Sequence, residues 1–226
     1  MSKKVKIFIG LPTMGELNTY TVVSIMTYFT NSVHRGDMDM MVYPTVGIRP
    51  HDRARNTIVE EFLKTDATHL FFIDADTVPP PDALDKLLKA DKDIISGLTP
   101  IIEHDPNRAN DSSGFYKKWN CVGEDDQLLK PNMGIVPIKG AGGSCILIKR
   151  EVFEGMEYPW YKFATEDDNG KKVEISEDIY FVIMAISKGF KPFADTSVIA
   201  KHSKNILWIL MIFVLPLSQL FGTIST

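Results

Sequence analysis

Short apolar runs alternate with segments of helical periodicity along most of the chain, and this alternation limits the folds that it can adopt. The apolar runs predict strands at 5–11, 39–46, 69–73, from 94, 136–148 and 190–202. Apolar residues at helical spacing predict helices at 18–30, 50–64, 82–88, 150–155 and 175–189. Strands that alternate with helices predict an α/β fold with a mostly parallel sheet and helices on both faces.

Two segments carry neither pattern. Residues 103–120 are polar and contain Gly and Asn, and residues 165–172 are acidic and contain Gly. We predict both as loops, and the first as a candidate lid.

The charge balance and the cysteine count exclude several classes of protein. The 226 residues carry 25 Lys and Arg against 29 Asp and Glu, a formal net charge of −4. Such a chain lacks the overall basic charge that duplex nucleic acid attracts, so no nucleic-acid partner is expected. Cys121 and Cys145 are too few for a disulfide scaffold or a cysteine-rich zinc module. We expect one globular domain over residues 1–204.

The rest of the chain, residues 205–226, is an apolar tail without a charged residue. A membrane-spanning helix needs about 20 mainly apolar residues, and the tail lies at the lower limit. One expectation for the tail is a membrane anchor. The alternatives are a packing helix, an oligomer contact or a truncated end. As an anchor, with Lys201 and Lys204 on its N-terminal side, it would place the domain at the cytoplasmic face.

Two carboxylates, Asp74 and Asp76, directly follow the strand predicted at 69–73. Ligands of open α/β sheets bind at the carboxyl ends of the strands, and paired carboxylates there suit Mg²⁺ or Mn²⁺. The alternative is that the two aspartates only cap a turn or helix.

A second acidic pair, Glu177 and Asp178, follows Ser176 at the start of the helix predicted at 175–189. One carboxylate could act as a general base toward a hydroxyl, or both could simply complement the helix dipole. His202 follows the last strand, where neutral imidazole could bind a metal or the side chain could only pack.

Two further segments could contact a ligand. Arg53 and Asn56 lie in the first turns of a helix, where arginine could orient a diphosphate or simply face solvent. The glycines around Gly142 and Gly143 permit close backbone approach to a ligand, or mark a bulged strand.

The order of these motifs resembles that of GT-A fold glycosyltransferases, most closely the inverting family-2-type enzymes with a DxD motif. The resemblance covers residues 5–202 and rests on three stretches, THLFFIDADTVPPPDAL, GAGGSCILIKREVFE and ISEDIYFVIMAISKGFKPFADTSVIAKH. It implies a Rossmann-like fold with a mixed, mainly parallel central sheet.

The resemblance also assigns residues to the donor side of such a site. Asp74 and Asp76 match the DxD motif, which holds Mn²⁺ or Mg²⁺ on the diphosphate of a nucleotide sugar, and His202 matches a metal-binding histidine of some relatives. Four residues match the nucleotide site. Pro12 and Thr13 match the region that receives the base and ribose, and Arg53 and Asn56 match a region that lines the site.

On the acceptor side, Gly142 and Gly143 match the segment between donor sugar and acceptor. Glu177 and Asp178 match the pair that supplies the base, with Asp178 preferred. Trp119 or Trp160 could stack on a sugar ring or pack in the core.

The expected activity is transfer of a sugar from a nucleotide-diphosphate sugar to a hydroxyl of a carbohydrate, lipid or protein acceptor. The chain lacks the Gln-x-x-Arg-Trp motif of processive synthases, and an obvious acidic residue for uracil is missing before Asp74, so the nucleotide stays open.

Two other functions remain open at this point. Residues 72–78 also fit the Asp-x-Asp-x-Thr pattern of haloacid-dehalogenase-like phosphatases, in which Asp74 would be the nucleophile. A strand–helix–strand unit before this motif, and three prolines after it, count against that function. The third alternative is a non-catalytic carbohydrate- or nucleotide-binding module.

Overall fold

The computed structural model describes residues 4–104, 115–168 and 171–202. The strands of its main sheet are β1 (Val5–Thr13), β2 (Met38–Val46), β3 (His69–Ile73), β5 (Ile94–Leu98), β8 (Cys121–Gly123), β9 (Ile135–Ala141), β10 (Cys145–Lys149) and β13 (Pro192–Ile199). The helices are α1 (Thr19–Arg35), α2 (His51–Leu63), α3 (Ala83–Lys89), α4 (Arg150–Glu154) and α5 (Glu177–Ser187), with a 3₁₀ turn η1 (Glu124–Asp126).

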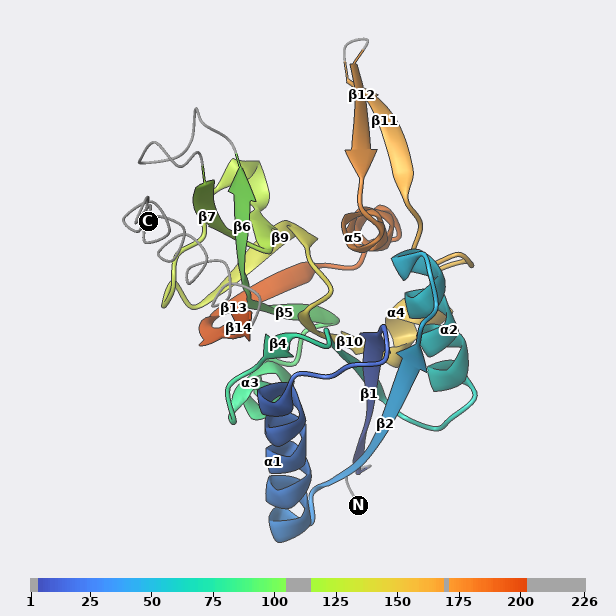
Figure 1. Ribbon diagram of the computed structural model, residues 1–226, viewed down its shortest axis with the longest axis vertical. Helices are drawn as coiled ribbons and strands as arrows, with labels where there is room; N and C mark the ends of the chain where they lie inside the picture. Colours follow the sequence, from blue (N-terminus) through green and yellow to red (C-terminus); the bar gives the residue numbers. More distant parts are fainter. Residues whose placement is uncertain (1–3, 105–114, 169–170, 203–226) are drawn as a thin grey trace, which may run out of the picture.

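The main sheet has the strand order β2-β1-β3-β10-β5-β13-β9-β8 (Figure 1). The pairs β2–β1, β1–β3 and β5–β13 are parallel, and the remaining pairs of the sheet are antiparallel. The predicted α/β class with a large central sheet is confirmed. Because β10 runs antiparallel between β3 and β5, its first residue lies beside the carboxyl ends of those strands.

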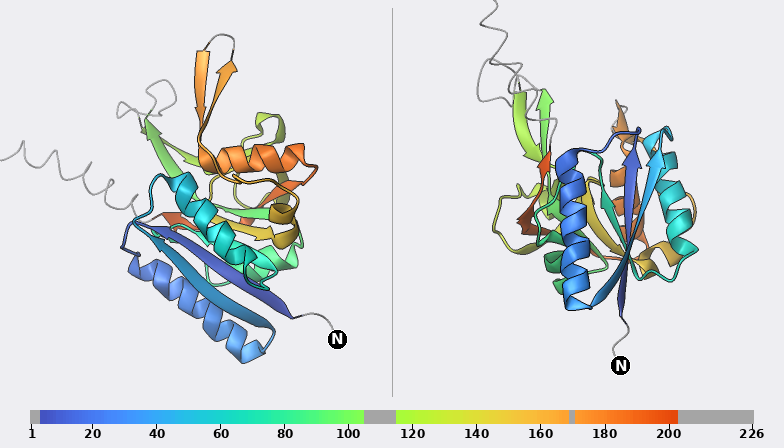
Figure 2. Two further views of the ribbon diagram at one scale, coloured as in Figure 1. Left: turned by 90° about the vertical axis from the view of Figure 1, so that its right-hand side faces the viewer. Right: turned by 60° about the horizontal axis from the view of Figure 1, so that its bottom comes forward.

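Alternate residues of each strand pack on opposite faces of the sheet, as the pleat requires. On one face, Ile9 of β1 and Phe71 of β3 pack with Tyr28 of α1 in a cluster that includes α3. On the other face, Phe8 and Phe72 pack in a cluster with α2, α4 and α5. Helices therefore cover both faces, and Figure 2 shows α1 and α2 on opposite sides of β1 and β2.

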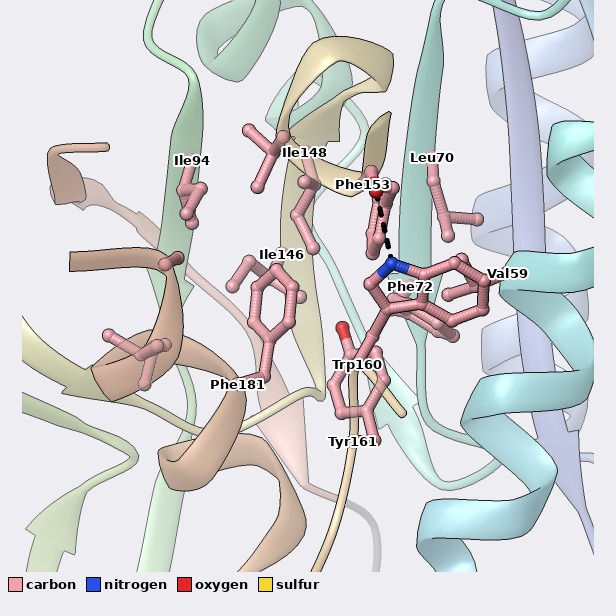
Figure 3. Packing of buried hydrophobic residues seen from close by; sticks show 14 of the residues in the cluster. Val59, Leu70, Phe72, Ile94, Ile146, Ile148, Phe153, Trp160, Tyr161 and Phe181 are labelled. Atoms are coloured by element: carbon pink, nitrogen blue, oxygen red, sulfur yellow. Dashed lines mark hydrogen bonds between the residues drawn. The ribbon is translucent and has the colours of Figure 1, made fainter. Parts of the chain in front are cut away.

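Several aromatic side chains of the second cluster pack against one another (Figure 3). Phe153 of α4 stacks on Phe181 of α5 with 5.5 Å between ring centroids, and its ring meets Phe62 of α2 edge-on at 5.8 Å. Tyr161 stacks on Phe181 at 4.7 Å. These contacts fix α5, which carries the second acidic pair, against α2.

Both segments predicted as loops contain strands, and those two predictions are wrong in part. β6 (Pro100–His104) pairs with β7 (Phe115–Trp119), and the residues between them, 105–114, lie outside the described residues. β11 (Ala164–Asp168) pairs with β12 (Lys171–Ile175), where opposite charges at 167 and 172 stand at paired positions. Cross-strand charge pairs stabilise a hairpin that the polar sequence alone does not indicate.

The glycine-rich segment divides the strand predicted at 136–148. β9 ends at Ala141 and β10 begins at Cys145, with Gly142 and Gly143 in the connection. The last predicted strand is also divided, into β13 and β14 (Lys201–His202), and β14 pairs with β4 (Thr77–Val78).

Candidate active site

The carboxyl ends of β1 and β3 border a cavity of about 610 Å³. Pro12 and Thr13 line it from β1, Asp74 and Asp76 from the residues after β3, and His202 from β14. Parallel strands end at the same edge of a sheet, which is where open α/β sheets bind ligands. Five of the residues singled out in the sequence therefore lie around one cavity.

His202 reaches Asp76 through the pairing of β14 with β4, in which His202 stands opposite Thr77. Its Nε2 lies 3.2 Å from Asp76 Oδ1, and the two side chains are 22% and 21% exposed. Within the part of the chain that the structure describes, His202 Nδ1 is buried and has no hydrogen-bond partner. The imidazole is thus held beside the carboxylate by the backbone.

Arg55 of α2 joins the two acidic pairs. Its side chain is only 4% exposed, and its Nη2 donates to Asp74 Oδ1 at 3.0 Å. Its Nε donates to Glu177 Oε1 at 3.2 Å, and its Nη1 to the carbonyl oxygen of Gly143 at 3.4 Å. One buried guanidinium therefore contacts the residue after β3, the start of α5 and the glycine connection.

The charge on Arg55 is stabilised by its neighbours. Burial by itself lowers the pKa of Arg55, but the carboxylates of Asp74, Glu177 and Asp178 outweigh burial and raise the pKa above its usual range. Arg55 is therefore a permanent cation at this site.

The two carboxylates at the start of α5 have different surroundings. Glu177 is buried against Arg55, whereas Asp178 is partly exposed. Asp178 Oδ2 accepts the Gly143 N–H at 3.2 Å, and Oδ1 accepts the Ile179 N–H at 2.8 Å and the Ser176 hydroxyl. Of the two, Asp178 has the more accessible and the more firmly oriented carboxylate.

Gly143 permits the close contact with Arg55. A Cβ at this position would lie 2.4 Å from Arg55 Cζ, which no side chain could tolerate without displacing the guanidinium. At Gly142 a Cβ would lie 3.1 Å from Asn120 Cβ and 3.5 Å from Asp178 Oδ2. The glycine connection is therefore closely packed between Arg55, Asn120 and Asp178.

The two arginines of α2 have different surroundings, and sequence reasoning singled out only Arg53. The side chain of Arg53 is exposed, and Arg55 takes the buried position. A sequence signal for this existed, because Arg55 precedes Ile58, Val59 and Phe62 at helical spacing on the apolar stripe. An arginine on a buried stripe needs anionic partners, and that requirement distinguishes it from Arg53.

Asn56 contacts the backbone of Tyr161. Its Nδ2 donates to the Tyr161 carbonyl oxygen at 2.8 Å, and its Oδ1 accepts the Tyr161 N–H at 3.1 Å. Trp160 is 8% exposed, and its Nε1 donates to the Phe153 carbonyl oxygen at 3.0 Å. Trp119 is partly buried against the same apolar cluster. Asn56 and Trp160 thus hold the segment before β11 on the core.

Sequence reasoning missed part of the cavity wall. Glu16, Asn18 and His51 also line the cavity. The hydroxyl of Thr13 donates to the Glu16 carbonyl oxygen at 2.6 Å and accepts the Gly15 N–H at 3.1 Å, which shapes this wall. The turn residues after β1 were the available signal, since loops at the carboxyl ends of strands form such sites.

The residues at this cavity fit a cation that takes only some of its ligands from the protein. Among the described residues, no three His, Cys, Asp or Glu side chains form a group that could hold a metal ion. Asp76 and His202 lie together, and Asp74 gives one oxygen to Arg55. Mg²⁺ and related ions at phosphate sites commonly take only one or two protein carboxylates, and phosphates and water complete the shell. Asp76 and His202 suit that kind of coordination.

No protein-family model matches the sequence, and no curated protein sequence is significantly similar to it. Among solved structures, A197 from STIV superposes with a TM-score of 0.55 at 18% identity, over 88% of this chain and 85% of that one. This likeness shows a shared fold.

Two further solved structures are less similar. The mannosyltransferase PcManGT from Pyrobaculum calidifontis, in complex with GDP-Man and Mn²⁺, has a TM-score of 0.49 at 13% identity, over 89% of this chain and 58% of that one. GalNAc-T7 with UDP, GalNAc and Mn²⁺ has a TM-score of 0.48 at 11% identity, over 89% of this chain and 44% of that one.

The chain spans less than two thirds of the length of these two proteins.

The described helices include none that is long and apolar enough to cross a membrane. The tail at 205–226 lies outside the described residues.

Proposed function

We propose that the chain is a metal-dependent glycosyltransferase that moves a sugar from a nucleotide-diphosphate sugar to an acceptor hydroxyl, with inversion at the sugar carbon. One observation carries the proposal. Arg55 holds Asp74 at 3.0 Å and Glu177 at 3.2 Å, so a single buried cation draws the two acidic pairs to one end of the sheet. The acceptor is a carbohydrate, a lipid or a protein.

The donor occupies the 610 Å³ cavity in this proposal. Pro12 and Thr13 border the base and ribose, and the diphosphate lies toward Asp74, Asp76 and His202. Asp76 and His202, with Asp74 beside them, would hold Mn²⁺ or Mg²⁺, and the bound ion would supply a Lewis acid for the charge of the leaving diphosphate.

Asp178 is the proposed general base. Its partly exposed carboxylate takes the proton of the acceptor hydroxyl as that oxygen attacks the sugar carbon. The Gly143 N–H on Oδ2 and the Ile179 N–H on Oδ1 fix the orientation of the carboxylate. Glu177, the other candidate, is buried against Arg55 and is less able to meet an acceptor.

The ion pair between Asp74 and Arg55 also bears on the phosphatase alternative. That mechanism requires Asp74 to attack a phosphate as the nucleophile. A carboxylate oxygen that accepts a charged hydrogen bond from a buried arginine is a weaker nucleophile, so the observed pair favours the transferase.

The test is a screen of nucleotide sugars with Mn²⁺ and mixed acceptors, read as release of nucleoside diphosphate by the full chain. We expect Asp178→Asn to lower kcat by about 10²–10⁴-fold, the contribution typical of a general base. Asp76→Asn should instead raise the Mn²⁺ concentration needed for half-maximal rate. Asp39→Asn, which changes an exposed aspartate of β2, is the matched control and should leave both values unchanged.

Three results would contradict the proposal. Steady release of phosphate from simple monoesters would favour the phosphatase. Nucleotide-sugar binding without turnover over a broad acceptor panel would favour a binding module. Equal rates for Asp178→Asn and the unsubstituted chain would remove Asp178 as the base.

A further inference from the structure

Burial of the Arg55 side chain lowers the free energy of unfolding unless carboxylates pair with its charge. The Arg55 side chain is 4% exposed, and it takes one carboxylate from each acidic pair, Asp74 and Glu177. Removing either carboxylate would leave a buried charge incompletely paired, which is strongly destabilising. The second carboxylate of each pair, Asp76 or Asp178, has other partners, His202 and the Gly143 N–H respectively.

Two aromatic rings also restrict the orientation of the guanidinium plane of Arg55. Its Cζ lies 5.2 Å from the ring centre of Phe72 and 5.9 Å from that of Tyr161. Arginine stacks its planar guanidinium on ring faces and presents its N–H donors in a rigid fork, whereas the ammonium of lysine is a compact charge with rotatable donors. The site therefore requires the shape of arginine in addition to its charge.

The same guanidinium supports the backbone that orients Asp178. Arg55 Nη1 donates to the Gly143 carbonyl oxygen at 3.4 Å, while the Gly143 N–H donates to Asp178 Oδ2 at 3.2 Å. A displacement of Arg55 would therefore move both the side chain of Glu177 and the N–H that holds Asp178.

We propose that Arg55 is a positioning residue that fixes the geometry between the cation-binding pair and the catalytic base. It keeps Asp74 and Glu177 as its counter-ions and sets the position of Gly143, so that Asp76 and Asp178 are the carboxylates that act on the reactants. This inference rests on the proposed function for its kinetic consequences, but not for its structural ones.

The kinetic test compares Arg55→Lys with the unsubstituted chain. A misplacement of about 1 Å at a reacting group can cost about 100-fold in rate, so we expect a fall in kcat of that order. The KM for the donor should change by less than about threefold, because an effect on positioning appears in kcat rather than in ground-state binding. Rates are divided by the folded fraction, measured by urea unfolding under assay conditions.

Arg35→Lys is the matched control. Arg35 also pairs with two aspartates, Asp37 and Asp85, but its side chain is 38% exposed and lies on α1. This variant should keep kcat and KM. A kcat for Arg55→Lys close to that of the control, or a raised KM with unchanged kcat, would overturn the proposal.

A second pair of variants moves the guanidinium without changing a charge. Gly143→Ala places a Cβ against Arg55 Cζ, whereas the tightest contact of a Cβ at Gly140 is the flexible end of the Ile179 side chain at 3.0 Å. We expect Gly143→Ala to lower kcat as Arg55→Lys does, and Gly140→Ala to retain most of it. Equal activity of the two alanine variants would contradict the assigned role of Arg55.

A readout without turnover separates this proposal from the proposed function. In a ¹⁵N-labelled sample, the amide resonance of Gly143 should shift in Arg55→Lys and stay in place in Arg35→Lys. If the chain transfers no sugar, the proposed function fails while this shift still supports the positioning role. An unchanged Gly143 resonance in a folded Arg55→Lys variant would refute the positioning role whatever the activity.

Discussion

At the scale of single residues, the two cysteines illustrate how burial decides chemistry. Cys121 and Cys145 are 7% and 0% exposed, and neither is in a disulfide. Burial raises the pKa of each thiol to about 12. Because the thiolate is the reactive form, neither cysteine is suited to catalysis at neutral pH.

We predict that neither thiol reacts quickly with Ellman's reagent in the folded protein at neutral pH. In guanidinium chloride both should react at the rate of free cysteine, since unfolding removes the burial that raises the pKa. The absorbance of the released thionitrobenzoate measures this directly. Rapid modification of one thiol without denaturant would show that the core around it opens.

Arg55 shows what residue-level sequence reasoning can and cannot reach. Its place on the apolar stripe of α2, before Ile58 and Phe62, is a pattern that indicates burial, but the sequence hypothesis named Arg53 instead. Its partners could not be predicted, because Glu177 lies 122 residues away and meets it only through packing of α5. The hypothesis for Arg53 considered arginine as a residue type without asking which helix face it occupies.

At the scale of elements, β3 and β10 place a titratable residue where the start of β3 pairs with the end of β10. His69, the first residue of β3, stands opposite Lys149 of β10. Burial, and then the charge of Lys149, lower the pKa of His69 below its ordinary value of 6.5, against weaker opposite effects of Glu151 and Asp91. The folded state thus favours the neutral imidazole.

The sign of the resulting pH dependence follows from proton linkage. As pH falls below about 6.5, the unfolded chain binds a proton at His69 before the folded chain does, so the free energy of unfolding decreases. We predict a smaller decrease in His69→Gln than in the unsubstituted protein, measured by urea unfolding from pH 7 downward. The exposed His34→Gln is the control and should retain the full decrease. Identical slopes for His69→Gln and the control would refute the prediction.

The elements themselves followed from the sequence where the local pattern was strong. The strands β1 and β3 and the helices α2 and α5 were predicted near their observed positions, because each combines a clear apolar period with an end signal. The hairpin of β11 and β12 was not, because its strands are polar and are stabilised by each other rather than by the core.

At the scale of the whole molecule, the position of the antiparallel strand β10 determines which residues meet at the candidate site. Its insertion between β3 and β5 brings Ser144 beside Asp74, whose N–H donates to the Ser144 carbonyl oxygen at 3.3 Å. The glycine connection thereby lies close to Asp74, and Arg55 and Asp178 both contact it at Gly143. Sequence alternation alone predicts neighbouring strands and helices but gives no strand order.

At the same scale, a membrane-anchor role for the tail at 205–226 is a proposal. If it anchors the domain at the cytoplasmic face of a membrane, deleting it should move the protein from the membrane fraction to the supernatant, because its apolar length is near the minimum for a span. Fractionation followed by immunoblotting measures the change, and an unaltered circular dichroism spectrum of the shortened protein is the control. The same distribution with and without the tail would exclude the anchor.

The sequence by itself determined the α/β class, the approximate positions of β1, β3, α2 and α5, and the acidic pairs that follow β3 and open α5. Those features depend on local periodicity and on residue type. The tertiary structure alone decided that Arg55 joins the two pairs and that His202 meets Asp76. Such contacts depend on strand order and on helix packing across the sheet, which arise from long-range burial of the apolar faces and leave no local pattern in the chain.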